Sequence, residues 1–256
     1  MTLSTESPIA LGRTDGLLEI TLTRSGKANA LTADMMARLG QAVASAEAHQ
    51  VVLLSSASPS LFCAGADIRE FAGGQLPQQE QALLAMIKAM ARSRAPIVAV
   101  ARGRASGAGA LLLCLADVVI AAEDLHVACP EFVFGMYPII VEAVLQSRLP
   151  PGIAAQMCLG TGVLSGARAQ EAGIVTELLP TAGFAEAARA RVDYYVERRP
   201  GLLAMRQSRN IGYATCVMCE QLETVAPLMM ENFQATGVRE RIAGYLDGLG
   251  GRQERR

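Results

Sequence analysis

The sequence lacks tryptophan, and aromatic residues make up only 4% of its 256 positions. Stacked aromatic side chains are the usual platform for unpaired nucleic-acid bases, so this composition disfavours such a role. Net charge is also nearly absent, because 23 Lys and Arg residues stand against 24 Asp and Glu residues, which leaves −1. Nucleic-acid-binding domains usually carry a basic surface. We therefore expect no nucleic-acid partner.

Long uncharged hydrophobic runs are missing as well, although 51% of the residues are hydrophobic. The most apolar stretch, residues 105–122, contains Asp117. A membrane span needs roughly 18 or more apolar residues with few or no charges. The first residues carry Glu6 and no basic residue ahead of an apolar run, which disfavours a secretory signal. The expectation is a cytoplasmic globular protein without membrane contact.

Cysteine and histidine are scarce, with six and two residues respectively. Six cysteines in a chain of this length are too few for a disulfide scaffold. Cys216 and Cys219 form one C-x-x-C pair, but a zinc site needs further ligands. The histidines, His49 and His126, have no spacing that joins them to this pair. We expect no bound metal and read both cysteines as buried structural residues.

Apolar strands alternate with amphipathic helices from residue 17 to residue 178, which indicates an α/β fold. The expected strands are 17–23, 51–54, 97–101, 118–121 and 174–178. The expected helices are 32–47, one that ends near Arg92, 107–115, 152–159 and 165–172. Beyond residue 183 the pattern is helical only. This predicts an α/β core over residues 1–180 and a helical region over residues 181–256.

Three loops rich in small residues follow expected strands, at 62–69, 103–109 and 128–132. Ligands of open α/β sheets bind beyond the carboxyl ends of strands, so these loops are candidates for one site. Gly107 and Ala108 lead directly into a helix, whose first N–H groups point outward at its positive end. Such N–H groups can stabilise a developing oxyanion. On spacing alone, the alternative is that small residues only allow close helix packing.

Glu131 follows Pro130 and lies close to an apolar stretch. Burial there would raise the pKa of its carboxyl group and suit it to proton transfer near neutral pH. The alternative is an acidic residue in the first turn of a helix, stabilised by the helix dipole.

Taken together, these loops resemble the crotonase, or enoyl-CoA hydratase/isomerase, superfamily. The matching stretches are 27–31 (KANAL), 62–68 (FCAGADI), 103–117, 130–135 (PEFVFG) and 164–175, in order along the chain. The resemblance implies a ββα spiral core with a helical C-terminal trimerisation region, and a homotrimer or dimer of trimers. It also implies an acyl-CoA thioester substrate, with no cofactor beyond the CoA that belongs to the substrate.

The resemblance also implies roles for single residues. The N–H groups of Ala66 and Ala108 would form the oxyanion hole, and Glu131 would be the catalytic acid and base. A substrate-binding role would fall to Lys27, Ala28, Ala64, Gly65, Asp67, Ile68, Arg69, Gly107, Leu111 and Pro138. Within that set, the basic residues Arg69 and Lys27 would meet the CoA phosphates, or they are simply solvated surface charges.

Two departures from the hydratase pattern bear on the reaction. Hydratases of this family use two glutamates, and Leu111 stands at the position of the first. Bulky residues at 139–141 replace their small Gly-Ala-Gly run. This site pattern is closest to the Δ3,Δ2-enoyl-CoA isomerases, in which one glutamate moves a proton. The alternatives are a decarboxylase or hydrolase of an acyl-CoA or carrier-protein thioester, a hydratase in which Glu142 is the second acid, and a non-catalytic acyl-CoA-binding subunit.

Overall fold

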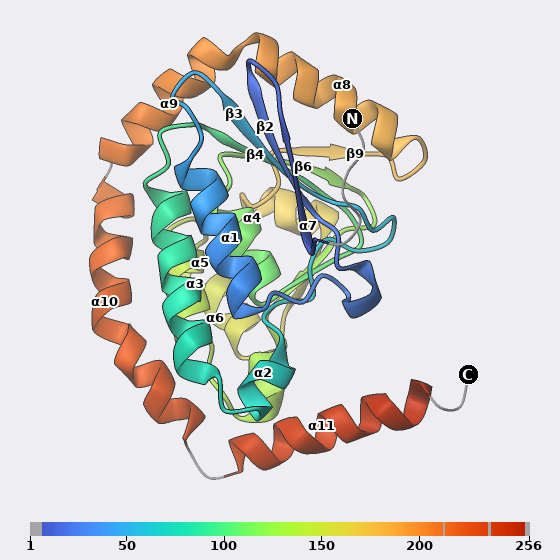
Figure 1. The fold of residues 1–256 in the computed structure, drawn as a ribbon, viewed down its shortest axis with the longest axis vertical. Coiled ribbons are helices and arrows are strands. Elements are labelled where there is room, and N and C mark those ends of the chain that lie inside the picture. The colour runs from blue at the N-terminus through green and yellow to red at the C-terminus, as the bar shows by residue number, and fades with distance from the viewer. Residues whose placement is uncertain (1–6, 212, 235–236, 254–256) are drawn as a thin grey trace.

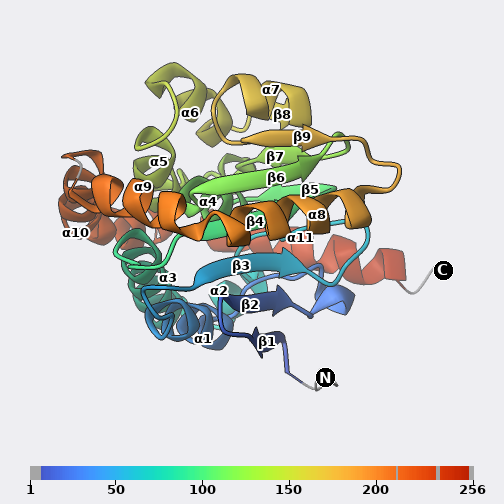
Figure 2. The same ribbon diagram turned by 90° about the horizontal axis from the view of Figure 1, so that it is seen from above.

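A computed structural model describes residues 7–211, 213–234 and 237–253. Its main sheet has six strands in the order β1-β2-β3-β4-β6-β9 (Figures 1 and 2). Their bounds are β1 Ile9–Arg13, β2 Leu17–Leu22, β3 Val51–Ser56, β4 Ile97–Ala101, β6 Val118–Ala122 and β9 Glu177–Leu179. The pair β1–β2 is antiparallel and the other pairs are parallel. A smaller sheet has the order β5-β7-β8, with β5 Arg104–Ser106, β7 His126–Ala128 and β8 Val163–Ser165.

Both faces of the main sheet are buried, which explains why its parallel strands are apolar at successive positions. Val52 and Leu54 of β3 point into the large core formed with α1 (Ala33–Ala44), α3 (Leu76–Ala91) and α4 (Ala108–Leu115). Val51 and Leu53, which face the other way, pack under α8 (Phe184–Glu197). Figure 2 shows α8 lying across the sheet.

The remaining helices surround this core. They are η1 Ser25–Lys27, α2 Ile68–Ala72, η2 Pro130–Phe134, α5 Ile139–Gln146, α6 Pro151–Cys158, α7 Gly166–Glu171, α9 Arg199–Ile211, α10 Tyr213–Phe233 and α11 Val238–Gln253. In Figure 1, α8 to α11 wrap around the molecule; α10 packs along α3 and α5, and α11 passes beside α2. The division of the chain at residue 180 stays a prediction. None of the described helices has the length and hydropathy needed to cross a bilayer.

Local signals account for several element boundaries. Helix α1 begins after Thr32, whose hydroxyl accepts a hydrogen bond from the Met35 N–H at 3.2 Å. It ends at Ala44, three residues before the expected end. The expected strand 174–178 is partly wrong, because β9 begins only at Glu177. Ile174 and its neighbour are buried in the turn after α7, so their apolar character reflects core packing and not a strand.

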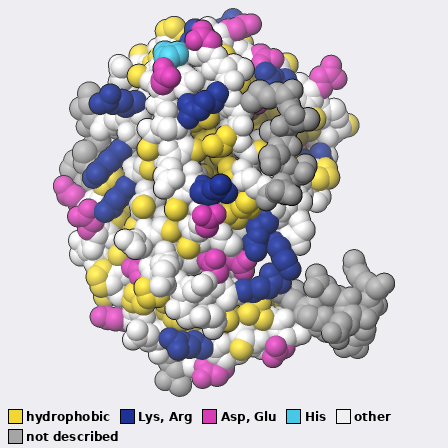
Figure 3. Space-filling view, viewed as in Figure 1, with side chains coloured by type: hydrophobic (Ala, Val, Ile, Leu, Met, Phe, Trp, Pro, Cys, Tyr) yellow, Lys and Arg dark blue, Asp and Glu magenta, His cyan; other side chains and the backbone are white. Residues whose placement is uncertain are grey.

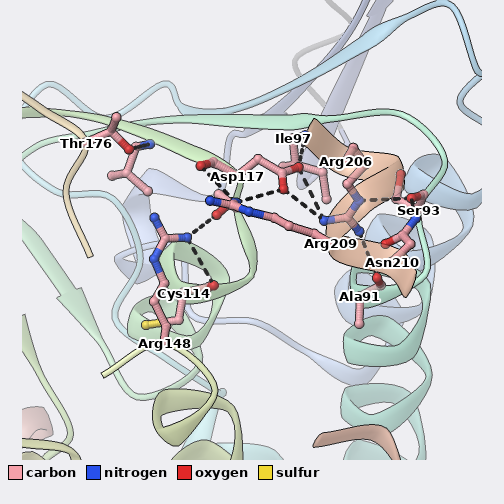
Figure 4. Close-up of polar contacts among 12 residues, drawn as sticks. Ala91, Ser93, Ile97, Cys114, Asp117, Arg148, Thr176, Arg206, Arg209 and Asn210 are labelled. Carbon is pink, nitrogen blue, oxygen red and sulfur yellow. Dashed lines mark hydrogen bonds and ion pairs between the residues drawn. The ribbon is translucent and has the colours of Figure 1, made fainter. Parts of the chain in front are cut away.

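Asp117, the charge within the apolar stretch 105–122, is buried and fully paired (Figure 4). Its carboxylate accepts from the Ile97 N–H at 2.8 Å and from the guanidinium of Arg206 at 3.2 Å. Arg209 donates to the same carboxylate, and Arg148 donates to carbonyls at the end of α4. A buried charge is tolerated when it is paired in this way. This cluster fastens α9 to the sheet and to the ends of α3 and α4.

Charged side chains of both signs lie side by side over much of the face in Figure 3, with apolar side chains between them. That distribution agrees with the near-zero net charge of the sequence.

Candidate active site

The segments 62–68 and 103–109 lie against each other, and residues 104–106 of the second, expected to be part of a loop, form strand β5. The Ser106 N–H donates to the Cys63 carbonyl at 2.9 Å, and Cys63 and Ala105 form an isolated parallel bridge. A Cβ atom added to Gly109 would lie 2.5 Å from the Cys63 oxygen, so only glycine permits this approach. The small residues therefore let two separate loops share one site.

The first loop directs the N–H of Ala66 into a cavity. The preceding carbonyl, Gly65 O, accepts from the Leu31 N–H at 2.8 Å. Because a trans peptide is planar, the carbonyl and the following N–H point in opposite directions. The N–H of Ala66 therefore faces away from Leu31, and Ala66 is one of the residues that line the cavity.

The second loop directs the N–H of Ala108 into the same cavity. Gly107 O accepts from the Leu111 N–H at 3.0 Å, so the N–H of Ala108 points out of the amino-terminal end of α4. A Cβ on Gly65 would be 3.7 Å from the Ala108 nitrogen, which shows how close the two segments are. Among the described residues, no protein acceptor bonds either alanine N–H. This arrangement can receive an oxyanion.

Glu131 brings a carboxylate to these two groups. It lies in η2, and its Oε1 would be 2.2 Å from a Cβ added to Gly107, whose φ is +51°. Its Oε2 is buried and has no hydrogen-bond partner within the described structure. Burial raises the pKa of Glu131 to about 7, and a hydrogen bond from its own backbone N–H opposes that rise. The group can therefore exchange a proton near neutral pH.

The cavity itself has a volume of about 50 Å³. Four residues of the expected set line it, namely Ala66, Ala108, Glu131 and Pro138. Ile140 and Val141, which also line it, belong to the bulky run 139–141 that the sequence singled out. Sequence reasoning did not assign the others to the site: Leu83, Met136, Tyr137 and Met229. Leu83 comes from α3 and Met229 from α10. No local motif marks such residues, because the fold alone brings them to the cavity.

Several expected substrate-binding residues lie along the Ala66 segment. The Ala64 N–H donates to Ala28 O at 3.0 Å, which joins residues 27–31 to this loop. The carboxylate of Asp67 is buried and pairs with Arg24 at 2.7 Å, so it holds the loop. Gly65 and Ile68 flank the same turn.

The other expected residues lie outside the cavity lining. Lys27, the last residue of η1, and Arg69, in α2, are both exposed. Leu111 is fully buried in α4 and belongs to the main hydrophobic core. Among the described residues that line the cavity, Glu131 is the one with a carboxylate. The carboxylate of Glu142 lies outside this lining and accepts a 2.7 Å hydrogen bond from the hydroxyl of the lining residue Tyr137.

Metal ligands do not gather in the part of the chain that the structure describes, where no three His, Cys, Asp or Glu side chains could hold an ion. Cys219 is buried, and the side chain of Cys216 lies outside the described residues. A larger hollow of about 440 Å³ is lined by Asp117 and Arg148. Asp117 already accepts from Arg206 and Arg209, and Arg148 already donates to nearby carbonyls.

Two converging backbone N–H groups beside a buried glutamate, on this α/β scaffold, define a crotonase-type protein. The family model described as enoyl-CoA hydratase/isomerase matches residues 12–250, and the chain belongs to this family. The 2,3-dehydroadipyl-CoA hydratase of Escherichia coli (strain K12) is 27% identical over 219 residues, covering 80% of this chain and 84% of its own. The carnitinyl-CoA dehydratase of Salmonella typhi is 29% identical over 214 residues, or 81% of each chain.

Solved structures confirm the expected fold class. An enoyl-CoA hydratase from Bacillus halodurans superposes with a TM-score of 0.82 at 19% identity, covering 93% of this chain and 100% of that one. A carnitinyl-CoA dehydratase from Mycobacterium avium 104 gives 0.75 at 21% identity, covering 91% and 94%. At these identities the likeness establishes the fold and leaves the reaction open.

Proposed function

We propose that the protein is an isomerase that converts a 3-enoyl-CoA thioester into the 2-enoyl-CoA thioester. The observation that carries the proposal is one buried carboxylate, Glu131, in an otherwise apolar cavity beside the N–H groups of Ala66 and Ala108. A single group that both accepts and donates a proton is sufficient for moving a double bond.

In the proposed reaction, the Glu131 carboxylate removes a proton from C2 of the substrate. The electron pair moves into the thioester carbonyl, and the N–H groups of Ala66 and Ala108 hold the resulting oxyanion. The protonated Glu131 then gives its proton to C4, and the double bond moves from C3–C4 to C2–C3. No other reactant enters, so the proposal requires no cofactor beyond the CoA of the substrate.

Two features of the cavity favour this chemistry. A pKa of about 7 lets Glu131 accept and return a proton at neutral pH. Ile140 and Val141 line the cavity where small residues would leave space, and exclusion of water suppresses hydration as a competing reaction. Leu111, an apolar residue at the first acid position, supplies no second carboxylate.

A hydratase is the second candidate, because the relatives named above are a hydratase and a dehydratase. One observation favours it: Tyr137 lines the cavity and holds Glu142 by a 2.7 Å hydrogen bond. In that case Glu142 would be the second acid, and water would have to reach the cavity past Ile140 and Val141.

The test is incubation with 3-hexenoyl-CoA and, separately, 2-hexenoyl-CoA, with products followed by mass spectrometry. An isomerase converts the 3-enoyl thioester at unchanged mass, and Glu131→Gln lowers kcat by about 10²–10⁴-fold while ligand affinity is kept. The matched variant Glu142→Gln keeps most of the activity. Gain of one water by the 2-enoyl thioester, with loss on Glu142→Gln, would instead establish a hydratase. Release of free CoA would indicate a hydrolase. Binding without reaction would indicate a non-catalytic subunit or a decarboxylase, whose substrate needs a carboxylate that these two thioesters lack.

Oligomerisation and CoA contacts belong to the same proposal. Exposed apolar residues at η2 and around β8 favour association of several copies, and Val133 and Val163 are 69% and 63% exposed. A trimer or hexamer would cover them, which light scattering of the purified protein measures directly. Lys27 and Arg69 are exposed beside the site loops and are available to CoA phosphates.

A further inference from the structure

The buried side-chain amide of Gln79 forms hydrogen bonds to the segment that contains Ala66. Gln79, in the first turn of α3, is 1% exposed. Its Nε2 donates to the carbonyl of Asp67 at 3.0 Å and to Oε2 of Glu70 at 2.6 Å. Asp67 directly follows Ala66, whose N–H faces the cavity. Gln79 thus holds the Asp67–Ile68 peptide, which is two peptide groups beyond the Gly65–Ala66 peptide that carries the Ala66 N–H.

Glu70 extends this network to a second helix. Its Oε2 also accepts from the Ala33 N–H at 2.9 Å, at the first residue of α1. A carboxylate at a helix amino terminus is stabilised by the unpaired N–H groups there. The Gln79–Glu70 pair therefore connects the Ala66 segment to α1 and α3, which pack against each other.

The Gly65–Ala66 peptide, which carries the Ala66 N–H, and the two peptide groups after it are each held by a hydrogen bond. Leu31 accepts from the Asp67 N–H at 2.8 Å and donates to Gly65 O at 2.8 Å, while Gln79 holds Asp67 O. The amide oxygen of Gln79, Oε1, is buried and has no hydrogen-bond partner in the described structure. Leaving such a group unpaired costs free energy, whereas an apolar side chain at this position would carry no such cost.

We propose that Gln79 is a positioning residue of the oxyanion hole, which acts through the Asp67 carbonyl to aim the N–H of Ala66 at the thioester oxygen. The inference rests on the oxyanion hole of the proposed function, but not on which reaction follows enolate formation. An oxyanion donor strengthens its bond in the transition state, so misaiming it lowers kcat more than it raises KM.

The test compares two buried glutamines with the same substitution. Gln79→Met keeps the length of the side chain and removes its polar atoms. Gln50→Met does the same at a residue that is 4% exposed and bonds Thr14 O and the Glu47 N–H, none of which lies in the site. Thermal unfolding of both variants measures how far each loses stability from the buried amide alone.

The first readout is independent of turnover. Binding of 2,4-hexadienoyl-CoA in an oxyanion hole polarises its carbonyl and shifts its absorbance to longer wavelength. We expect Gln79→Met to reduce this shift and to lower kcat about tenfold with KM changed less than threefold, since loss of an entire donor costs about 10²–10³-fold. Gln50→Met should change neither quantity.

Three results would overturn the inference. Gln79→Met could keep the absorbance shift and a kcat within twofold of the unaltered protein. Gln79→Met and Gln50→Met could lose equal amounts of activity, or Gln79→Met could change KM alone. If Gln79→Met does not fold, Gln79→Glu keeps the side-chain size and removes the amide donors, and the same criteria apply to it. The two proposals can also fail separately. If the unaltered protein shows the absorbance shift but does not isomerise 3-hexenoyl-CoA, the proposed function is refuted. If Gln79→Met then loses the shift, Gln79 is still a positioning residue of the oxyanion hole.

Discussion

The carboxylate of Glu131 occupies the space above Gly107, where a side chain on that glycine would begin. An added Cβ atom would lie 2.2 Å from Oε1, and the φ of Gly107 is +51°. The same glycine precedes Ala108, whose N–H faces the cavity. One residue without a side chain thus allows the acid and an oxyanion donor to approach the same space.

Gly107→Ala should therefore remove activity, because the new methyl group displaces Glu131. We expect kcat to fall by more than about 10²-fold, in the range that loss of a general acid or base produces. Gly183→Ala is the control for adding a methyl group at a positive φ (+70°) where the space around the Cβ position is open. Steady-state kinetics compare the two variants, and equal losses would refute the steric explanation.

The rate should depend on the protonation of Glu131. Burial raises its pKa to about 7, and the reaction needs the carboxylate form as the base. We expect kcat/KM for 3-hexenoyl-CoA to rise about tenfold per pH unit below pH 7 and to level off above it. A rate that is constant between pH 5 and pH 8 would contradict the assignment of Glu131 as the base.

The same pKa predicts an effect on stability. The folded protein holds the Glu131 proton up to about pH 7, whereas the unfolded chain releases it near the ordinary value of 4.5. Stability from this group is therefore fully present below pH 4.5 and is lost as the pH rises toward 7. Glu131→Gln, which stays neutral, should gain on the order of 2 kcal/mol relative to the unaltered protein between pH 5 and pH 8. Denaturant unfolding of both proteins at pH 5 and pH 8 measures this gain. If the two proteins differ in unfolding free energy by the same amount at both pH values, the prediction is refuted.

Local sequence signals were sufficient for most elements of the core. The Thr32 cap, the apolar strands and the glycine-rich loops all depend on neighbours in the chain, and the structure places them close to the predicted positions. The strand expected from Ile174 failed because burial alone cannot distinguish a turn packed on the core from a strand. The apolar character of a residue indicates that its side chain is buried, but it does not indicate which hydrogen bonds its backbone makes.

Local sequence signals could not predict contacts between residues that come from different helices. Met229 lines the cavity from α10, 98 positions after Glu131 in the chain. Gln79 reaches Asp67 from α3, and Arg206 of α9 pairs with Asp117 just before β6. Each contact depends on how whole helices pack, so a single sequence shows the residue types without their pairing.

The cavity wall predicts a preference for short acyl chains. Met229 lines the cavity together with Ile140 and Val141, so its side chain takes up space that a long alkyl tail would need. Met229→Ala removes a flexible side chain from that wall, so the ratio of kcat/KM for 3-decenoyl-CoA to that for 3-hexenoyl-CoA should rise about tenfold, the gain expected from relieving roughly 1.4 kcal/mol of steric cost.

Met218→Ala is the matched control for that change. Met218 lies in the same helix and is similarly buried, but it does not line this cavity. Both substitutions should lower the free energy of unfolding by about 2–5 kcal/mol, as truncation of a buried methionine does. Only Met229→Ala should alter the chain-length ratio, because only that residue meets the acyl tail. An unchanged ratio in Met229→Ala, or an equal change in Met218→Ala, would show that the tail leaves the site by another route.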